Sequence, residues 1–182
     1  MTAFLKILVL CLLLLTLTSC HYVARLRGPC SIWPMPEPEG SRAVTQTFSS
    51  NEGRFRIGLP DRSEPAAEGN TKTFKWLIIN VGAYQVFFVD REVAVDTPEV
   101  SEALFKRFRE SASSHGKLTD SEISISGHPG REFRTEDDGG TRIERIYLAG
   151  NRIYVVSVFV PKSMDCKIGS AAKVLDTFEI ID

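Results

Sequence analysis

Hydrophobic and polar residues alternate along most of the chain after Thr45, and this period of two is typical of β-strands. Turn-forming residues separate the alternating segments, so we expect a strand in each. The expected strands cover residues 48–50, 54–59, 71–80, 82–92, 118–126, 130–136, 141–149, 152–160 and 178–181. The stretch Tyr84–Val89 is apolar on both faces, which predicts that its strand lies in the middle of a sheet.

Two segments follow a helical period instead. An apolar residue recurs every four positions from Val100 onward, which places one apolar stripe along a helix. Thr97 suits the N-cap and Pro98 suits the first helical position. We therefore expect a helix over residues 98–115 and a shorter one over residues 167–176.

This order of elements predicts one α+β domain over residues 45–182. Consecutive strands joined by tight turns are antiparallel, so we expect a central antiparallel β-sheet of about six to seven strands with helices packed on its faces. The residues that we expect to be largely buried are Phe87, Val89, Leu104, Phe108, Phe133, Tyr154, Val156 and Val158.

The residues before this domain look like an export signal. Lys6 is followed by an apolar run over residues 7–18 and by the small residue Ser19. The ending Leu17-Thr18-Ser19-Cys20 resembles the lipobox of a bacterial lipoprotein signal. This resemblance implies removal of residues 1–19 and diacylation of Cys20. His21, in place of Asp, then favours the outer membrane where there is one.

The alternative is an uncleaved membrane helix over residues 7–24. Polar residues weaken its second half, and Arg25 and Arg27 would favour keeping the following chain in the cytoplasm. We prefer the lipoprotein interpretation. The domain then lies outside the cytoplasm, in the cell envelope, and residues 20–44 form an acylated, Pro-rich tether.

Composition narrows the classes of partner and the role of the cysteines. Loss of Lys6 with the signal leaves 21 of the 22 basic residues against 23 acidic ones, so no basic excess supports nucleic-acid binding. With Cys11 removed and Cys20 acylated, Cys30 and Cys166 remain. In an oxidising compartment they could form a disulfide, or both could stay free thiols.

Four segments of the domain resemble one known superfamily. They are Phe55-Arg56-Ile57-Gly58-Leu59-Pro60, Gly127-His128-Pro129-Gly130-Arg131-Glu132-Phe133, Tyr147-Leu148-Ala149-Gly150-Asn151-Arg152-Ile153-Tyr154 and Lys173-Val174-Leu175-Asp176-Thr177-Phe178. Their order and spacing are similar to those of the PsbP-like superfamily. The resemblance implies a central antiparallel sheet with helices on its faces, and a binding or accessory role in place of catalysis. It carries no functional residue over to this chain.

The candidate chemical groups are scattered. His21, His115 and His128 lack metal-ligand spacing. Asp90 and Glu92 are two residues apart on a strand, so they share one face. They could act together in acid/base catalysis, or they could simply be charged residues at an exposed strand end. The Asp137-Asp138-Gly139-Gly140 stretch lacks the twelfth-position Glu of a calcium loop, and we interpret it as a hairpin turn.

Arginines concentrate in and after this hairpin, interleaved with Glu132, Glu136 and Glu144. They could form an anion-binding face, or pair with the acids across strands and keep an exposed sheet face soluble; we prefer pairing because acids nearly match bases. A three-residue turn would set Arg134 opposite Glu144 and Glu136 opposite Arg142. The arginines in question are Arg131, Arg134, Arg142, Arg145 and Arg152.

The function that we expect is that of a non-catalytic envelope lipoprotein. It would bind a membrane-proximal protein or a small ligand, with no cofactor, no metal and no nucleic acid. The alternative is a hydrolase-type enzyme with a dispersed site, using Asp90 or His128.

Overall fold

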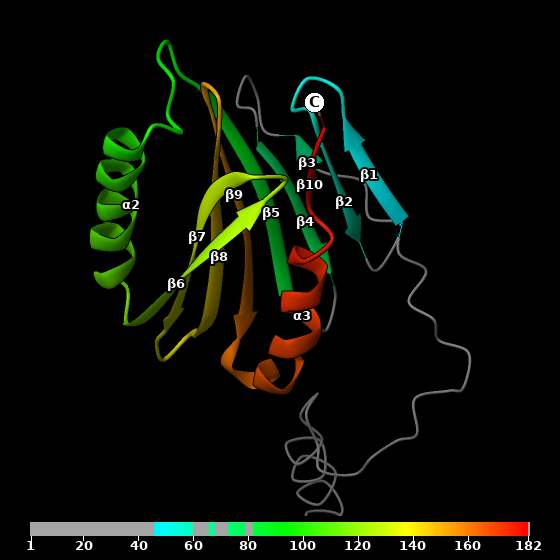
Figure 1. Ribbon diagram of the computed structural model, residues 1–182. Helices are drawn as coiled ribbons and strands as arrows, with labels where there is room; N and C mark the ends of the chain where they lie inside the picture. Colours follow the sequence, from blue (N-terminus) through cyan, green and yellow to red (C-terminus); the bar gives the residue numbers. More distant parts are fainter. Residues whose placement is uncertain (1–45, 60–65, 68–72, 79–81, 182) are drawn as a thin grey trace, which may run out of the picture. The chain divides into compact units, whose positions relative to one another are not determined.

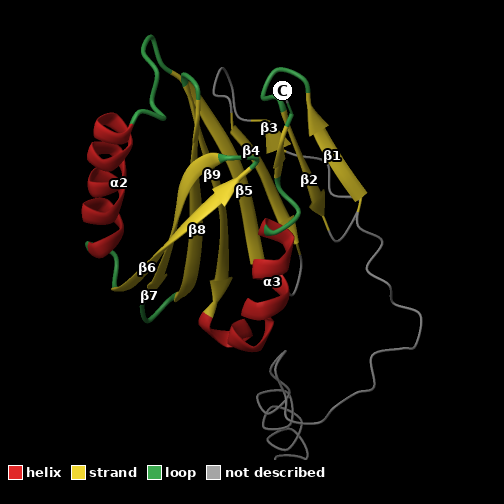
Figure 2. Cartoon of the chain, viewed as in Figure 1, coloured by secondary structure: helices red, strands yellow, loops and turns green. Residues whose placement is uncertain are grey.

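The computed structural model describes residues 46–59, 66–67, 73–78 and 82–181, and the described residues contain two antiparallel sheets and two α-helices (Figures 1 and 2). The expected α+β fold is confirmed. The elements are β1 (Gln46–Ser50), β2 (Phe55–Leu59), β3 (Ala66–Ala67), β4 (Thr73–Ile78), β5 (Gly82–Asp90), α2 (Pro98–Ser113), β6 (Lys117–Ile125), β7 (His128–Glu136), β8 (Gly140–Ala149), β9 (Arg152–Pro161), the 3-10 helix η1 (Lys162–Lys167), α3 (Ile168–Leu175) and β10 (Glu179–Ile180).

The larger sheet has seven strands in the order β3-β4-β5-β9-β8-β7-β6. Strand β9 lies at its centre, between β5 and β8, and every residue of β9 from Arg152 to Val158 is buried. A strand with apolar residues on both faces needs cover on both faces, and β9 has it over most of its length.

The first hairpin and the terminal strand form a second sheet, with the order β1-β2-β10. The sequence predicted one central sheet, and the structure adds this small second one. Here β2 is buried at Phe55, Ile57 and Leu59, and these residues belong to the core shared with one face of the larger sheet. The hairpin therefore serves as a cover for that face.

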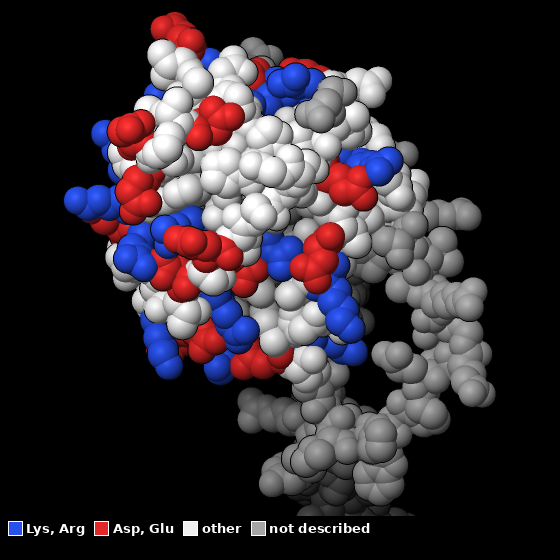
Figure 3. Space-filling view, viewed as in Figure 1, with Lys and Arg blue, Asp and Glu red and all other residues white. Residues whose placement is uncertain are grey.

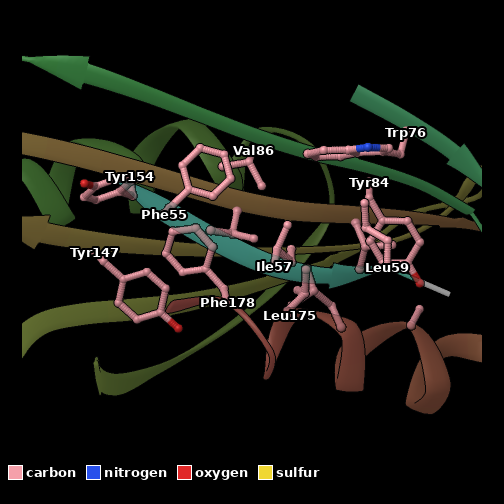
Figure 4. Close-up of a cluster of buried hydrophobic side chains, with 14 of the residues drawn as sticks. Phe55, Ile57, Leu59, Trp76, Tyr84, Val86, Tyr147, Tyr154, Leu175 and Phe178 are labelled. Atoms are coloured by element: carbon pink, nitrogen blue, oxygen red, sulfur yellow. The ribbon is translucent and has the colours of Figure 1, made fainter. Parts of the chain in front are cut away.

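Aromatic side chains fill this first core. Phe55 and Phe178 lie 5.6 Å apart between ring centroids, and Tyr147 stacks on Phe178 at 5.7 Å (Figure 4). Helix α3 adds Ala171 and Leu175 to the same cluster. Burial of an aromatic side chain stabilises a fold by several times the free energy of one hydrogen bond, so this layer fixes β2 and α3 against the larger sheet.

Helix α2 covers the opposite face of the larger sheet, over β6 and β7. Phe105 and Ala112 pack with Phe133, Leu148 and Val155 in a second core. The sequence placed the helix end at residue 115, whereas α2 ends at Ser113 and α3 begins at Ile168 after η1.

The core prediction is correct in half of its members. Phe133, Tyr154, Val156 and Val158 are buried, whereas Phe87, Val89, Leu104 and Phe108 are only half-buried. The reason is the position of α2. It lies over the β6–β7 side of the sheet, so Phe87 and Val89 on β5 lie beyond its main contacts.

The expected β7–β8 register is wrong by one residue. Glu136 lies opposite Thr141 and Arg134 opposite Ile143, because the turn has two residues, Asp138 and Gly139. The Asp137 side chain accepts hydrogen bonds from the N–H groups of Gly139 and Gly140, at 2.7 and 2.9 Å, and this Asx geometry tightens the turn.

Candidate binding groove

Part of the sheet face that carries α2 is open to solvent over β4, β5 and the end of β9. One cross-strand row on this face consists of Leu77, Ala83, Phe159 and Arg142, each directly opposite the next. Leu77 is 74% exposed, Ala83 is exposed and Phe159 is half-buried. An exposed apolar row on a sheet face is unusual enough to suggest a contact surface.

Two hollows meet along this row. The first, of about 380 Å³, is mainly apolar and includes Leu77, Ala83 and Phe159 in its lining. The second, of about 230 Å³, is polar and lies at the C-terminal end of α2, where His115, Asp137 and Glu144 line it. Both hollows share Arg142 and Phe159, so they form one groove that changes from apolar to polar along its length.

The residues of the next row give the groove its polar contacts. Gln85, Ser157 and Glu144 follow one another across β5, β9 and β8. The Arg142 guanidinium lies 5.7 Å from the centroid of the Phe159 ring and 3.8 Å from Glu144. Such a surface can hold an amphipathic ligand, with its apolar part on Leu77 and Ala83 and its polar part near Arg142.

The alternating pattern of the sequence places the groove residues on one face of their strands, but it does not identify them as a binding surface. Residues 77, 83 and 159 occupy outward positions in strands whose other face is buried. The only signal was that these outward positions are apolar, and an apolar outward position looks the same whether a helix covers it or not.

The histidine and carboxylate candidates do not come together. His128 begins β7 and Asp90 ends β5, with β9 and β8 between them, so roughly 14 Å separates their strands. Asp90 is ion-paired with Arg152. His115 lies at the rim of the polar hollow, on α2's side. The rival hydrolase site built on Asp90 or His128 therefore has no geometric support.

Ser111, His115 and Asp137 do line one hollow. However, no hydrogen bond joins these three described residues, and Asp137 accepts hydrogen bonds from the amide groups of its own turn. A nucleophile, base and orienting acid need mutual hydrogen bonds to act together. This set is a polar rim and has no catalytic geometry.

Each of the five hairpin-region arginines has a carboxylate partner. Arg131 pairs with Glu122 directly across the β6–β7 ladder, and Arg145 pairs with Glu132 across the β7–β8 ladder at 2.7 Å. Arg134 and Arg142 instead pair along their own strands, with Glu136 and Glu144, because of the shifted register. The interpretation as ion pairs fits the structure better than a free anion-binding face.

Arg145 also joins the sheet to the end of α3. Its second partner is Asp176, at 2.7 Å. Burial alone would lower the pKa of Arg145, but the hydrogen bonds to Glu132 and Asp176 outweigh it and raise the pKa above its ordinary value. The cation therefore stays charged and serves as a clamp.

Among the residues described by the structure, no three His, Cys, Asp or Glu side chains lie close enough to hold a metal ion. Within the same residues, no helix has both the length and the apolar character needed to cross a bilayer. The signal at residues 1–19, the acylation site Cys20, the tether at residues 20–44 and Cys30 lie outside the described part of the chain. Cys166 is exposed on η1 and is disulfide-bonded.

Comparison with known proteins supports the fold and goes no further. The solution structure of cyanobacterial PsbP (CyanoP) from Synechocystis sp. PCC 6803 superposes with a TM-score of 0.56 at 14% sequence identity, over 76% of this chain and 93% of that chain. A crystal structure from Bacteroides thetaiotaomicron VPI-5482 gives a TM-score of 0.50 at 16% identity, over 76% of this chain and 49% of that one. No family model and no curated protein matches the sequence. The PsbP-like fold resemblance is thus confirmed.

Proposed function

We propose that this chain is a non-catalytic binding module of the cell envelope, held at a membrane by lipid on Cys20. The observation that carries the proposal is the apolar row of Leu77, Ala83 and Phe159 beside α2, in which Leu77 and Ala83 are exposed and Phe159 is half-buried. A sheet face that bears apolar residues in water is stabilised when a partner covers it.

The dimensions of the open strip suit a protein partner. Three strands at about 4.8 Å spacing span about 10–14 Å, close to the diameter of one α-helix, about 10 Å. Helix α2 already packs on the adjoining part of the same face. We therefore favour an amphipathic helix of a membrane-proximal protein as the partner, with a small amphipathic ligand as the second choice.

The tether gives the module its reach. The Pro-rich residues 21–40 would extend at most about 60 Å at the rise of a polyproline helix. This is long enough for the domain to meet a partner complex close to the bilayer.

A photo-crosslinking amino acid at position 77 tests the groove. Leu77 is so exposed that its replacement leaves the core intact. We expect a discrete crosslinked product from position 77 in the protein's own membranes and none from position 93. Val93 is the matched control because it is also apolar and 63% exposed, but lies in the loop before α2 and not in the groove. The product should disappear when Ala83 is replaced by Glu.

Equal crosslinking from positions 77 and 93 would mean that the groove has no special role. Turnover in a hydrolase screen that is lost in His115→Ala or His128→Ala would favour the enzyme instead. The anchor has its own test, mass spectrometry of the N-terminal peptide. A Cys20→Ala protein that is still processed and membrane-bound would contradict the lipid anchor.

A further inference from the structure

Strand β6 forms one edge of the seven-stranded sheet, away from the groove. It is nine residues long and pairs with β7 in unbroken register from Lys117 opposite Glu136 to Ile125 opposite His128. The backbone groups of its outer side lack a strand partner in the described part of the chain. Only an extended chain offers donors and acceptors at the matching spacing.

Natural sheets usually protect such edges, and the two edges of this sheet differ. The opposite edge strand, β3, has only two residues, which limits pairing. Strand β6 contains no Pro and no bulge, and its charged residues, Lys117, Asp120 and Glu122, all lie in its first two thirds. Its last three residues, Ile123–Ile125, carry no charge.

The uncharged part continues through the hairpin. Residues 123–130 include no Lys, Arg, Asp or Glu. Figure 3 shows the result as an uncharged area over the tip of the β6–β7 hairpin, next to mixed charges over the start of β6 and α2. Ser126 and Gly127 both have positive φ, of 50° and 83°, as in the tight two-residue turns that give a rigid hairpin.

The two faces of β6 differ in chemistry. Ile123 and Ile125 are half-buried and pack against the first core, so an added strand could extend that core with apolar side chains. Glu122 is on the opposite face, beside α2, and its side chain is 81% exposed.

The charges around Glu122 favour a basic partner. Two guanidinium groups, of Arg109 and Arg131, meet three carboxylates, of Asp120, Glu102 and Glu122. The side chains of Glu102 and Glu122 are 74% and 81% exposed, against 56% for Arg109 and 21% for Arg131, so the two acids face solvent more than the two guanidinium groups. A hollow of about 300 Å³ lies next to this cluster, and Glu102, Asp120 and Arg131 are among its lining residues.

We propose that the free edge of β6 binds an extended segment of a partner protein as an additional strand. The segment carries a basic residue opposite Glu122 and apolar residues opposite Ile123 and Ile125. Because the side chains of a strand alternate, the basic side chain lies on the α2 side of the sheet, next to the exposed Glu122 carboxylate, while the apolar ones join the first core. This edge is separate from the groove, so the proposal stands independently of the function proposed above.

Two synthetic peptides test the proposal with the full chain in detergent. Acetyl-Thr-Lys-Val-Thr-Val-Thr-amide presents the pattern to a parallel pairing, and acetyl-Thr-Val-Thr-Val-Lys-Thr-amide presents it to an antiparallel one. We expect one of them, at up to millimolar concentration, to shift the backbone amide signals of residues 122–125 in a saturable way. It should protect every second of these amides, because the alternate N–H groups already bond to β7. The amides of Ala83 and Phe159 should not change.

The charge is tested by exchange. Glu122→Lys should weaken binding of the Lys peptide at least tenfold, and a peptide with Glu in place of Lys should recover that loss. Thr47→Lys, on the exposed edge strand β1, is the matched control and should have no effect.

Three results would overturn the proposal. The first is the absence of saturable change in β6 with both peptides. The second is equal binding by Glu122→Lys. The third is a dimer of the full chain, seen by sedimentation, whose β6 amides are already protected and which Glu122→Lys dissociates, since the occupant would then be a second copy.

Discussion

Arg152 and Asp90 lie opposite each other on β9 and β5 and form an ion pair that also ties the two sheets together. The guanidinium group donates to the Asp90 carboxylate, with Nη2 at 3.0 Å from Oδ2, and Nη1 donates to the backbone oxygen of Glu52 at 2.9 Å. It also lies 4.4 Å from the centroid of the Phe88 ring. One buried cation thus holds the β1–β2 turn on the larger sheet.

Replacing Asp90 should therefore be costly. Asp90→Asn leaves the Arg152 charge, whose side chain is 9% exposed, without its counter-charge. We expect a loss of about 2–3 kcal/mol in the free energy of unfolding, below the ~3–5 kcal/mol of a fully buried pair because Asp90 is 35% exposed. Urea denaturation measures it. Glu179→Gln, in the exposed Arg56–Glu179 pair, is the control and should cost less than about 1 kcal/mol. Equal losses would mean that burial of Arg152 is unimportant.

Two buried tyrosines should respond oppositely to loss of their hydroxyl groups. The Tyr154 hydroxyl donates to the backbone oxygen of Gly53 at 2.9 Å, so Tyr154→Phe should cost about 1 kcal/mol. Among the described residues, the Tyr84 hydroxyl has no hydrogen-bond partner although Tyr84 is buried. Tyr84→Phe should therefore be neutral or slightly stabilising. Thermal unfolding of both variants at neutral pH checks this, and a large loss for Tyr84→Phe would refute it.

Tyr84 should also make the protein less stable at alkaline pH. Burial raises the pKa of Tyr84 above its ordinary value of 10.0. Below pH 10 both the folded and the unfolded protein keep the proton. As the pH rises above 10, only the unfolded chain releases it, so the free energy of unfolding falls by up to about 1.4 kcal/mol per pH unit.

Urea midpoints measured between pH 9 and pH 11.5 test this slope. Tyr84→Phe should make it shallower. Part of it should persist, since burial likewise raises the pKa of Tyr147. An unchanged slope in Tyr84→Phe would show that Tyr84 does not contribute.

Gly140, at the start of β8, should not tolerate a side chain. Its φ is +155°, and a Cβ there would clash with the backbone oxygen of Val160. Gly140→Ala should lower the free energy of unfolding by at least about 2 kcal/mol. Gly150→Ala, at φ +59° with open space around it, is the matched control and should cost about 1 kcal/mol. Similar losses would show that the clash is relieved by a backbone shift.

The partner of Cys166 is predicted to be Cys30. Peptide mapping without reduction should yield one linked pair containing both residues. If they pair, Cys166→Ser should lower the free energy of unfolding by about 2–4 kcal/mol, because the long closed loop restricts the unfolded chain. Two thiols that alkylate in the native protein would end the idea.

Local patterns in the sequence were sufficient to predict the elements and the fold class. Alternation located every long strand within a few residues, and the Thr97-Pro98 start with its apolar stripe located α2. These features depend on neighbours a few positions apart, and a period of two or 3.6 residues states which side chains share a face. The ion-paired arginines were also foreseeable, because acids and bases alternate within one hairpin.

Tertiary structure decided what covers each face. That β1, β2 and β10 form their own sheet, and that α2 leaves Leu77, Ala83 and Phe159 open, depends on contacts between segments tens of residues apart. The register of β7 and β8 depended on one residue of turn length, which the Asp137 hydrogen bonds fixed. Periodicity assigns a residue to a face of its strand or helix. Burial of that face depends on which distant element packs on it, and the local sequence pattern does not show which element that is.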